Sequence, residues 1–277
     1  LAIYNHLIKN KNFRVIGTTT NSKAKHFIEN QNNLNSLILF DFLKDNNIEG
    51  LLKSVKPNII INCIGIIKQS TLISNKINTI FLNSILPNKL SILALKNGIK
   101  LIQISTDCVF SGKIGSYMES DNPDPTDTYG RTKLIGEITN DSSLTLRTSL
   151  VGHELFTKNG LLEWFLSQKY ECIGFKNALF SGFTTTAFAK ILETILTNKE
   201  DLKGLYHVSS KVISKYDFLK KINKVYNKNI KINEDHSFKI DRSLISSALE
   251  EKIKYKVETW DIMIKEMFKE RFLYVQK

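Results

Sequence analysis

Tyr129 and Lys133 are the residues of this sequence whose types and spacing first suggest chemistry. They stand four residues apart at the start of a segment with a helical pattern, so their side chains share one face. A phenol with a pKa of about 10 is a poor acid or base at neutral pH, but a neighbouring ammonium favours the phenolate and lowers that pKa. The pair is therefore a candidate for proton transfer. In a chain with 39 Lys and Arg residues, a solvated surface pair formed by chance is the alternative.

Hydroxyl and carboxyl side chains follow a strongly apolar segment further up the chain. Ser105, Thr106 and Asp107 come directly after residues 101–104, which read LIQI. Donors held at the end of a buried strand can stabilise charge that develops on a substrate oxygen. The two hydroxyls, of Ser105 and Thr106, therefore stand where a substrate-polarising partner of Tyr129 is expected.

The elements that must position these residues alternate along the first half of the chain. Five short segments rich in apolar and β-branched residues are predicted as strands, namely residues 13–17, 36–40, 59–63, 101–105 and 144–148. Between them, residues 48–55, 81–97 and 129–139 carry apolar side chains at helical intervals. This alternation predicts the α/β class, with a doubly wound, Rossmann-type parallel sheet covered by helices on both faces.

The rhythm loosens beyond about residue 150. Helices are predicted near residues 161–168, 185–197, 215–226 and after residue 258, with a strand at residues 205–208. We expect residues 1–150 to form the sheet domain. Residues 151–277 are expected to form mainly a smaller C-terminal lobe, with some segments returning to the first domain.

Composition limits the classes of function. The net charge is +12, but only five of the 39 basic residues are arginines and the lysines are scattered, which argues against nucleic-acid binding and favours attraction of a small anionic ligand. No apolar run reaches the roughly 18 residues of a membrane helix. The three cysteines lie far apart without metal-ligand or redox spacing, which is typical of reduced thiols in a cytoplasmic protein. We expect a soluble cytoplasmic protein without a metal.

Three motifs of the chain are residues 105–112 (STDCVFSG), 117–119 (YME) and 129–137 (YGRTKLIGE). At these motifs the chain resembles the extended short-chain dehydrogenase/reductase family, and within it the dTDP-4-dehydrorhamnose reductase type of sugar-nucleotide reductase. Further similar segments extend the resemblance over nearly the whole chain: residues 61–65 (INCIG), 146–152 (LRTSLVG), 180–185 (FSGFTT) and 241–244 (DRSL).

The resemblance implies roles for the residues at these motifs. Thr106 would bind the substrate carbonyl oxygen, with Ser105 as a second hydroxyl beside it and at the cofactor. Tyr129 would donate a proton to that oxygen, and Lys133 would hold the cofactor ribose while lowering the pKa of Tyr129. A bound nicotinamide would supply the hydride. Residues 1–150 would then be the NAD(P)-binding domain and residues 151–277 the substrate-binding lobe.

Further cofactor contacts are expected where other strands end. Asp41 and Phe42 stand where the family contacts adenine, although an acidic residue there is also a common cap. Ile64 and Gly65 follow residues 59–63, and a glycine lets the backbone approach a cofactor or simply turn. NADPH is favoured over NADH, because residues 18–23 read TTTNSK and contain no acid for a ribose 2′-hydroxyl.

Substrate contacts are expected from Thr106, Asp107, Gly152, His153 and Arg242. The planar guanidinium of Arg242 suits a diphosphate, with an ordinary ion pair as the alternative. Gly152 and His153 follow residues 144–148 and could lie over the sugar, but His153 could equally be a structural hydrogen bonder. The ligand class implied is a nucleotide sugar, and helices beside the sheet could pair in a homodimer.

The reaction class depends on the residue after Asp107. Dehydratases of this family place a glutamate there, and this chain has Cys108. Reduction of the 4-keto group of a nucleotide-linked 6-deoxy sugar, for cell-surface polysaccharide precursors, is therefore favoured. A sugar-nucleotide epimerase of the same family and a non-catalytic nucleotide-binding regulatory subunit are the alternatives.

The family's glycine-rich loop has no counterpart in the sequence. Such a Gly-x-x-Gly-x-x-Gly loop cradles the cofactor pyrophosphate at a helix N-terminus. Residues 1–9 (LAIYNHLIK) read as the rest of that helix. We therefore expect the sequence to be a fragment that lacks this loop and the strand before it.

Overall fold

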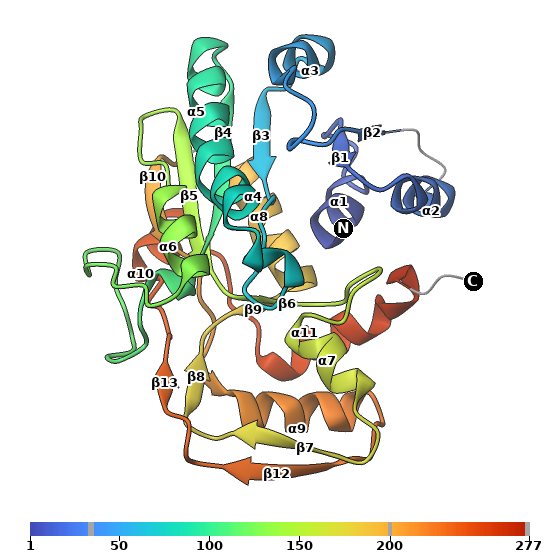
Figure 1. Ribbon diagram of the computed structural model, residues 1–277, viewed down its shortest axis with the longest axis vertical. Helices are drawn as coiled ribbons and strands as arrows, with labels where there is room; N and C mark the ends of the chain where they lie inside the picture. The colour runs from blue at the N-terminus through green and yellow to red at the C-terminus, as the bar shows by residue number, and fades with distance from the viewer. Residues whose placement is uncertain (33–35, 199–200, 275–277) are drawn as a thin grey trace.

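A four-stranded parallel sheet is the centre of the computed structural model, which describes residues 1–32, 36–198 and 201–274. Its order is β10-β5-β4-β3, formed by β3 (Ile59–Asn62), β4 (Lys100–Thr106), β5 (Ser143–Thr148) and β10 (Gly204–His207). Every neighbouring pair is parallel, so the strands all end at the same edge (Figure 1). The site residues that follow β3, β4 and β5 therefore share that edge.

Two shorter strands form a separate parallel pair. They are β1 (Gly17–Thr19) and β2 (Leu37–Leu39), with α1 (Ala2–Leu7), α2 (Ser22–Asn32) and α3 (Ile48–Val55) nearby. The predicted strand at residues 13–17 was wrong by about four residues, because the Phe13 amide closes a turn onto the Asn10 carbonyl. Gly17 then opens the strand, paired with Leu37.

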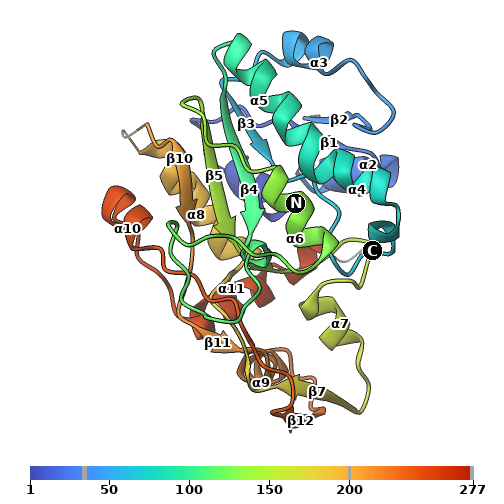
Figure 2. The same ribbon diagram turned by 60° about the vertical axis from the view of Figure 1, so that its left-hand side comes forward.

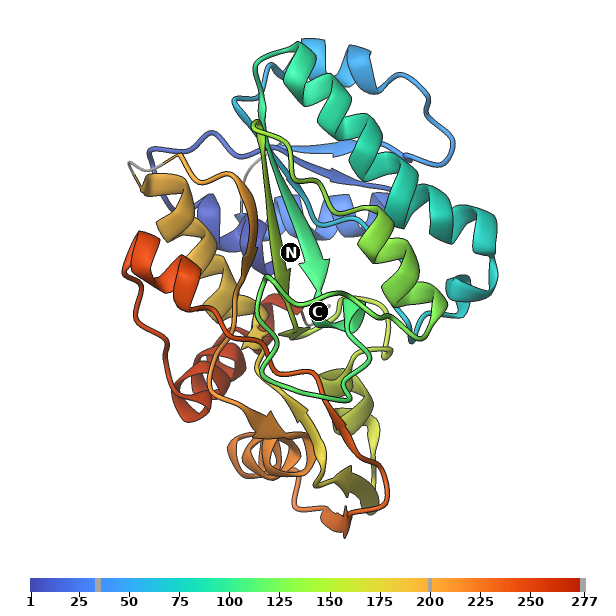
Figure 3. The same cartoon turned by 90° about the vertical axis from the view of Figure 1, so that its left-hand side faces the viewer.

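Adjacent residues of β4 face opposite sides of the sheet and pack into two different cores. Leu101 packs with Leu90 of α5 (Leu86–Lys96), while Ile102 belongs to the core that holds Leu192 of α8 (Thr185–Thr197). Strand residues alternate between faces, so an apolar strand needs helices on both sides. The two helices lie on opposite faces of the sheet in Figure 3. The predicted doubly wound α/β fold is confirmed.

The predicted helix at residues 81–97 has a more complex form. It begins earlier, as α4 (Lys76–Ile80), passes through a π-helical turn, η2 (Phe81–Ile85), and continues as α5. The helix that carries Tyr129 and Lys133 is α6 (Thr128–Ile135), which packs beside η2 (Figure 2). The π-turn is thus placed against the helix that carries the candidate proton donor.

The described part of the chain after residue 150, apart from α8 and β10, forms a lobe of small sheets and helices, called the lower lobe here. β7 (Glu171–Phe175) pairs with β12 (Lys231–Asp235), and β8 (Ala178–Phe180) lies between β11 (Ile213–Ser214) and β13 (Ile240–Asp241). β6 (Leu150–Val151) pairs with β9 (Phe183–Thr184). The helices of this lobe are α7 (Leu161–Ser167), α9 (Lys215–Val225), α10 (Ser247–Ile253), α11 (Trp260–Lys269) and the 3-10 helix η4 (Arg271–Tyr274). Two further 3-10 helices, η1 (Thr71–Ser74) and η3 (Asp107–Val109), follow β3 and β4 of the four-stranded sheet.

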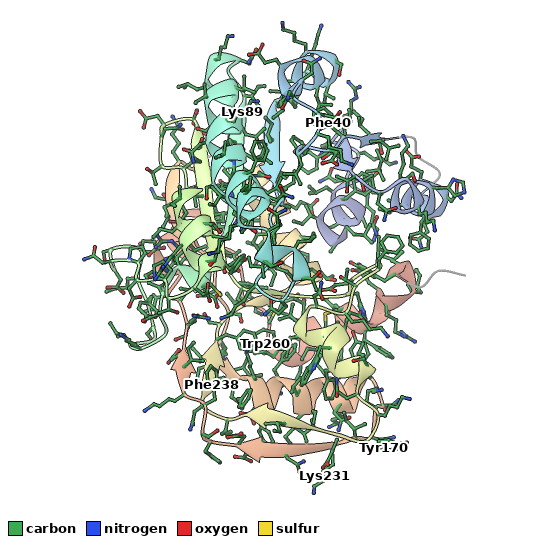
Figure 4. All side chains as sticks on the ribbon, in the orientation of Figure 1. Phe40, Lys89, Tyr170, Lys231, Phe238 and Trp260 are labelled. Atoms are coloured by element: carbon green, nitrogen blue, oxygen red, sulfur yellow. The ribbon has the colours of Figure 1, made fainter. Side chains whose placement is uncertain are left out.

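Trp260 joins two helices of this lobe, α9 and α11. Trp260, labelled in Figure 4, is the first residue of α11. Its ring meets Phe180 and Phe218 edge-on, at centroid distances of 5.4 and 5.3 Å, and its indole N–H donates to the Lys211 carbonyl at 2.7 Å. Such a buried aromatic cluster holds α9 and α11 together. Among the described residues, no helix is both long enough and apolar enough to cross a membrane.

Candidate active site

Thr106 closes strand β4 and begins η3. Its hydroxyl accepts the Cys108 amide at 3.1 Å and donates to the Asp107 carboxylate at 3.2 Å. Thr106 and Asp107 are both buried. Burial raises the pKa of Asp107, against the attraction of Arg242. The strand end thus presents a fixed hydroxyl next to a carboxyl group in a poorly hydrated place.

Helix α6 brings Tyr129 to this strand end. Asp127 caps the helix by accepting the Gly130 amide at 2.8 Å and pairs with Lys68 at 2.8 Å. A Cβ on Gly130 would lie 2.2 Å from the Cys108 carbonyl oxygen, so only glycine lets α6 approach η3 this closely. The next residue back, Tyr129, therefore stands beside Thr106 and Cys108.

The phenol of Tyr129 is held in its protonated form. Burial raises its pKa above the usual range, and the neighbouring Cys108 adds to this effect. A side-chain hydrogen bond with Thr106 opposes it. We expected a lowered pKa for Tyr129 because of Lys133, but in the structure the pKa of Tyr129 is raised. The physical reason is that desolvation of the phenol outweighs the favourable contacts.

Lys133 points from α6 to the same end of β4. Its ammonium donates to the Ile104 carbonyl at 2.7 Å, and the residue is 5% exposed. Burial lowers its pKa to about 8, although Cys63 and Glu137 act in the opposite direction. A Cβ built on Gly65 would lie 3.9 Å from this ammonium. The structure therefore brings together Gly65 and Lys133, both predicted to bind the cofactor.

Asn83, which we did not predict, joins the loop after β3 to helix α6. It lies in the π-turn, fully buried, where its carboxamide accepts the Ile66 amide at 2.8 Å. The same side chain donates to the Ile66 carbonyl at 3.0 Å and to the Thr132 hydroxyl at 3.1 Å. The sequence signal for this role is an asparagine within an apolar helical pattern. A buried side chain of this kind almost always has hydrogen-bond partners, so it can join two segments.

A buried ion pair lies behind Thr106. Arg147 donates to both carboxylate oxygens of Glu137, at 2.8 and 2.7 Å, and the same carboxylate accepts the Ser105 hydroxyl at 2.6 Å. Ser105, predicted to bind the cofactor, thus has its hydroxyl directed at Glu137. In the sequence, Glu137 was noted only as part of the motif at residues 129–137, and its role as partner of Arg147 and Ser105 was not predicted. Its position one helical turn after Lys133 was the available signal that it lies on the same face.

Arg242 reaches the strand end from the lower lobe. Its Nε donates to the Phe110 carbonyl at 2.9 Å, and its Nη1 lies 3.6 Å from the Cys108 sulfur. The predicted substrate residues Asp107 and Arg242 are therefore neighbours. Burial raises the pKa of Cys108 to about 12, so the thiol is protonated.

Other predicted residues lie elsewhere. The Asp41 carboxylate accepts the Leu43 amide at 3.0 Å as part of a turn, and Phe42 packs in the core beneath α3 and α5. Ile64 donates its amide to the Asn62 side chain at 3.1 Å, directly after β3. The Asp41 contact is local, like the capping alternative. Ile64 lies just after β3 of the four-stranded sheet, whereas Asp41 follows β2 of the separate strand pair.

His153 is engaged by protein partners. Nδ1 lies 2.6 Å from Glu163, and Nε2 lies 2.8 Å from the Tyr226 hydroxyl. A Cβ on the preceding Gly152 would lie 2.1 Å from the Thr185 hydroxyl, so this glycine packs tightly against α8. His153 lines a cavity of about 530 Å³ together with Tyr226, and these contacts match the structural alternative for the histidine.

Comparisons with known proteins agree with this architecture. A dTDP-4-dehydrorhamnose reductase from Aggregatibacter actinomycetemcomitans is 28% identical over 184 residues, which are 61% of this chain and 61% of that protein. The methionine adenosyltransferase 2 subunit beta of Xenopus laevis is 33% identical over 90 residues, covering 32% and 27% of the two chains. The chain thus spans about three fifths or less of the length of these relatives.

A solved structure has the same fold along most of the chain. A dTDP-4-dehydrorhamnose reductase from Bacillus anthracis in complex with NADP superposes with a TM-score of 0.74 and 24% identity, covering 93% of this chain and 99% of that chain. A family model described as the RmlD substrate binding domain matches residues 5–271. This protein therefore belongs to the family of the RmlD substrate binding domain.

Proposed function

We propose that the protein reduces the 4-keto group of a nucleotide-linked 6-deoxy sugar with NADPH, with NADH as the second choice of cofactor. The observation that carries the proposal is the phenol of Tyr129, held protonated beside the Thr106 hydroxyl at the end of β4. Reduction of a ketone needs a proton donor at the oxygen, and a protonated phenol is one. The names of the reductase relatives support the substrate class.

Thr106 and Tyr129 divide the work at the carbonyl oxygen. The Thr106 hydroxyl orients the substrate oxygen, and the Tyr129 hydroxyl donates its proton there as negative charge develops. Cys108 provides no base at the neighbouring position, because its pKa is raised to about 12. This favours reduction over elimination of water, which needs a base to remove a carbon-bound proton.

Residues around Lys133 fit a dinucleotide. Lys133 and Gly65 face one another, and Gly65 offers the backbone a close approach that a side chain would block against Asn83. A nicotinamide dinucleotide supplies the hydride when bound. In the proposal Lys133 holds ribose hydroxyls, Ser105, Ile64 and Gly65 line the cofactor, and Asp41 faces the adenine. The predicted adenine contact of Phe42 is not kept, because its ring packs in the core. Residues 1–150 bind the cofactor.

Substrate residues come from both parts of the chain. Asp107 and Arg242 lie side by side at the end of β4, and in the proposal they contact the sugar and its diphosphate. Gly152 and His153 belong to the wall of the substrate lobe, residues 151–277. The proposal places the protein in the cytoplasm as a homodimer that makes precursors of cell-surface polysaccharide.

The test is NADPH oxidation, followed at 340 nm, with dTDP- and UDP-linked 4-keto-6-deoxy sugars. The wild-type protein should consume NADPH, and Tyr129→Phe should lose about 100-fold or more of the rate. An epimerase would convert the nucleotide sugar without net oxidation of NADPH. A regulatory subunit would bind the nucleotide without either reaction, and that result would refute the proposal.

A further inference from the structure

Lys215, a residue that neither the motifs nor the proposed mechanism uses, lies at the catalytic strand end. It is the first residue of α9, which Ser214 caps by accepting the Asp217 amide at 2.9 Å. β11 ends at Ser214 and β13 ends at Asp241, and these two residues pair with Leu179 of β8 from opposite sides, so Lys215 and Arg242 each follow a strand that flanks β8. The charge of Lys215 interacts with Asp107 and Arg242. The substrate lobe thus contributes a second cation, in addition to Arg242, to the end of β4.

The charge of Lys215 is only partly balanced by protein groups. Asp217, the nearest acid along α9, is bonded to Ser214 at 2.6 Å and to Lys176 at 3.0 Å. Within the described ranges, Lys215 forms no salt bridge at 4 Å or less. The residue is half-buried, and burial lowers its pKa. Holding an ammonium there without a direct partner is unfavourable unless a ligand compensates it.

Three cations from three separate segments act on one another near the end of β4. Lys68 comes from the loop after β3, Arg242 from the segment after β13 and Lys215 from α9, and the charges of all three interact. Two carboxylates accompany them: Asp127 pairs with Lys68 at 2.8 Å, and Asp107 interacts with both Arg242 and Lys215. The group therefore keeps an excess positive charge in a partly desolvated place, which suits an anion.

We propose that Lys215 and Arg242 together bind the diphosphate of a nucleoside diphosphate, so that Lys215 is a substrate-binding residue. The assignment of the anion to the substrate rests on the proposed function. Both cations belong to residues beyond 150, whereas the proposed cofactor residues come from the sheet domain: Gly65 lies in the loop after β3, and the Lys133 ammonium is next to it. A guanidinium and an ammonium on two elements can hold two phosphate groups at once.

Calorimetric titration with UDP and with dTDP tests this assignment directly. Lys215→Gln should weaken binding of the nucleoside diphosphate that the wild-type protein prefers by about 10- to 100-fold. Lys215→Arg should stay within about threefold of wild type. Lys211→Gln is the matched control, since it removes the same charge from an exposed position four residues earlier. NADPH affinity should be the same in all four proteins.

Four results would overturn the assignment, three of them on diphosphate binding. These three are equal diphosphate affinity in Lys215→Gln and wild type, an equal loss in Lys211→Gln, and no diphosphate binding by the wild-type protein. A parallel loss of NADPH affinity in Lys215→Gln and Lys215→Arg would also contradict it, because the damage would then be general. Diphosphate binding that depends on Lys215 without any sugar reduction would uphold this inference while refuting the proposed reaction, so the two fail separately.

Discussion

Replacing Arg147 with methionine should destabilise the protein strongly, because a carboxylate would stay buried without its partner. Arg147 and Glu137 have side chains only 5% and 6% exposed, joined by two hydrogen bonds of 2.8 and 2.7 Å. Removing one partner of such a pair costs roughly 3–5 kcal/mol. The Ser105 hydroxyl, at 2.6 Å, remains for Glu137 but contributes only about 1 kcal/mol.

Urea unfolding followed by circular dichroism measures this loss. For a chain of this length, the expected loss corresponds to roughly 6–10 °C in Tm. Lys221→Met is the control, since the Lys221–Asp261 pair is 34% and 61% exposed and should contribute under about 1 kcal/mol. The double variant Glu137→Leu/Arg147→Met should recover most of the stability, because no charge stays buried. A loss in Arg147→Met no larger than in Lys221→Met would refute the reasoning.

Four further outcomes follow from the site. Burial lowers the pKa of Lys133 from 10.5 to about 8, so the unfolded state binds more protons between these values. Chemical denaturation should therefore show the free energy of unfolding of the wild-type protein rising with pH across that window. Below pH 8, Lys133→Met should be up to roughly 3 kcal/mol more stable than wild type. A stability difference between the two proteins that does not change with pH would contradict this. Thr106→Val should lower kcat by about 100-fold in protein that is still folded, at a cost of roughly 1–2 kcal/mol for the lost cap of η3. Unchanged kcat would remove Thr106 from the mechanism. Asn83→Ala should cost roughly 2–4 kcal/mol in urea unfolding, as three buried hydrogen bonds are lost; a loss below 1 kcal/mol would show that this hub is replaceable. Iodoacetamide at pH 8 should alkylate Cys108, whose pKa is raised to about 12, on the order of a thousandfold more slowly than an exposed thiol, as mass spectrometry would measure.

The sheet and its principal helices could be predicted because their signals are local. The apolar segments of β3, β4 and β5 need helices on both faces, and the helices show apolar residues at helical intervals. The start of β1 was misplaced because a turn onto Asn10 depends on contacts that no pattern reports. The π-turn Phe81–Ile85 was missed because a single wider turn shifts the apolar pattern by one residue only, which a short helical segment does not reveal.

The proximity of the candidate catalytic residues could be predicted from their types and spacing, but their electrostatics could not. Tyr129 and Thr106 are neighbours as expected, whereas the sign of the pKa shift of Tyr129 depends on how deeply the phenol is buried. Glu137 and Asn83 act through partners far along the chain, which a single sequence does not pair. Lys215 is one lysine among many in the sequence, and only the fold places it beside Asp107.

Transfer of deuterium from cofactor to product tests the central claim most directly. With NADPH deuterated at the transferring position of C4 and a nucleotide-linked 4-keto-6-deoxy sugar, the wild-type protein should give a product one mass unit heavier, with the label at sugar C4 by NMR. Tyr129→Phe should form that labelled product about 100-fold or more slowly, because the proton donor is lost. A reduced product without deuterium at C4, or labelled product formed equally fast by Tyr129→Phe, would contradict the account.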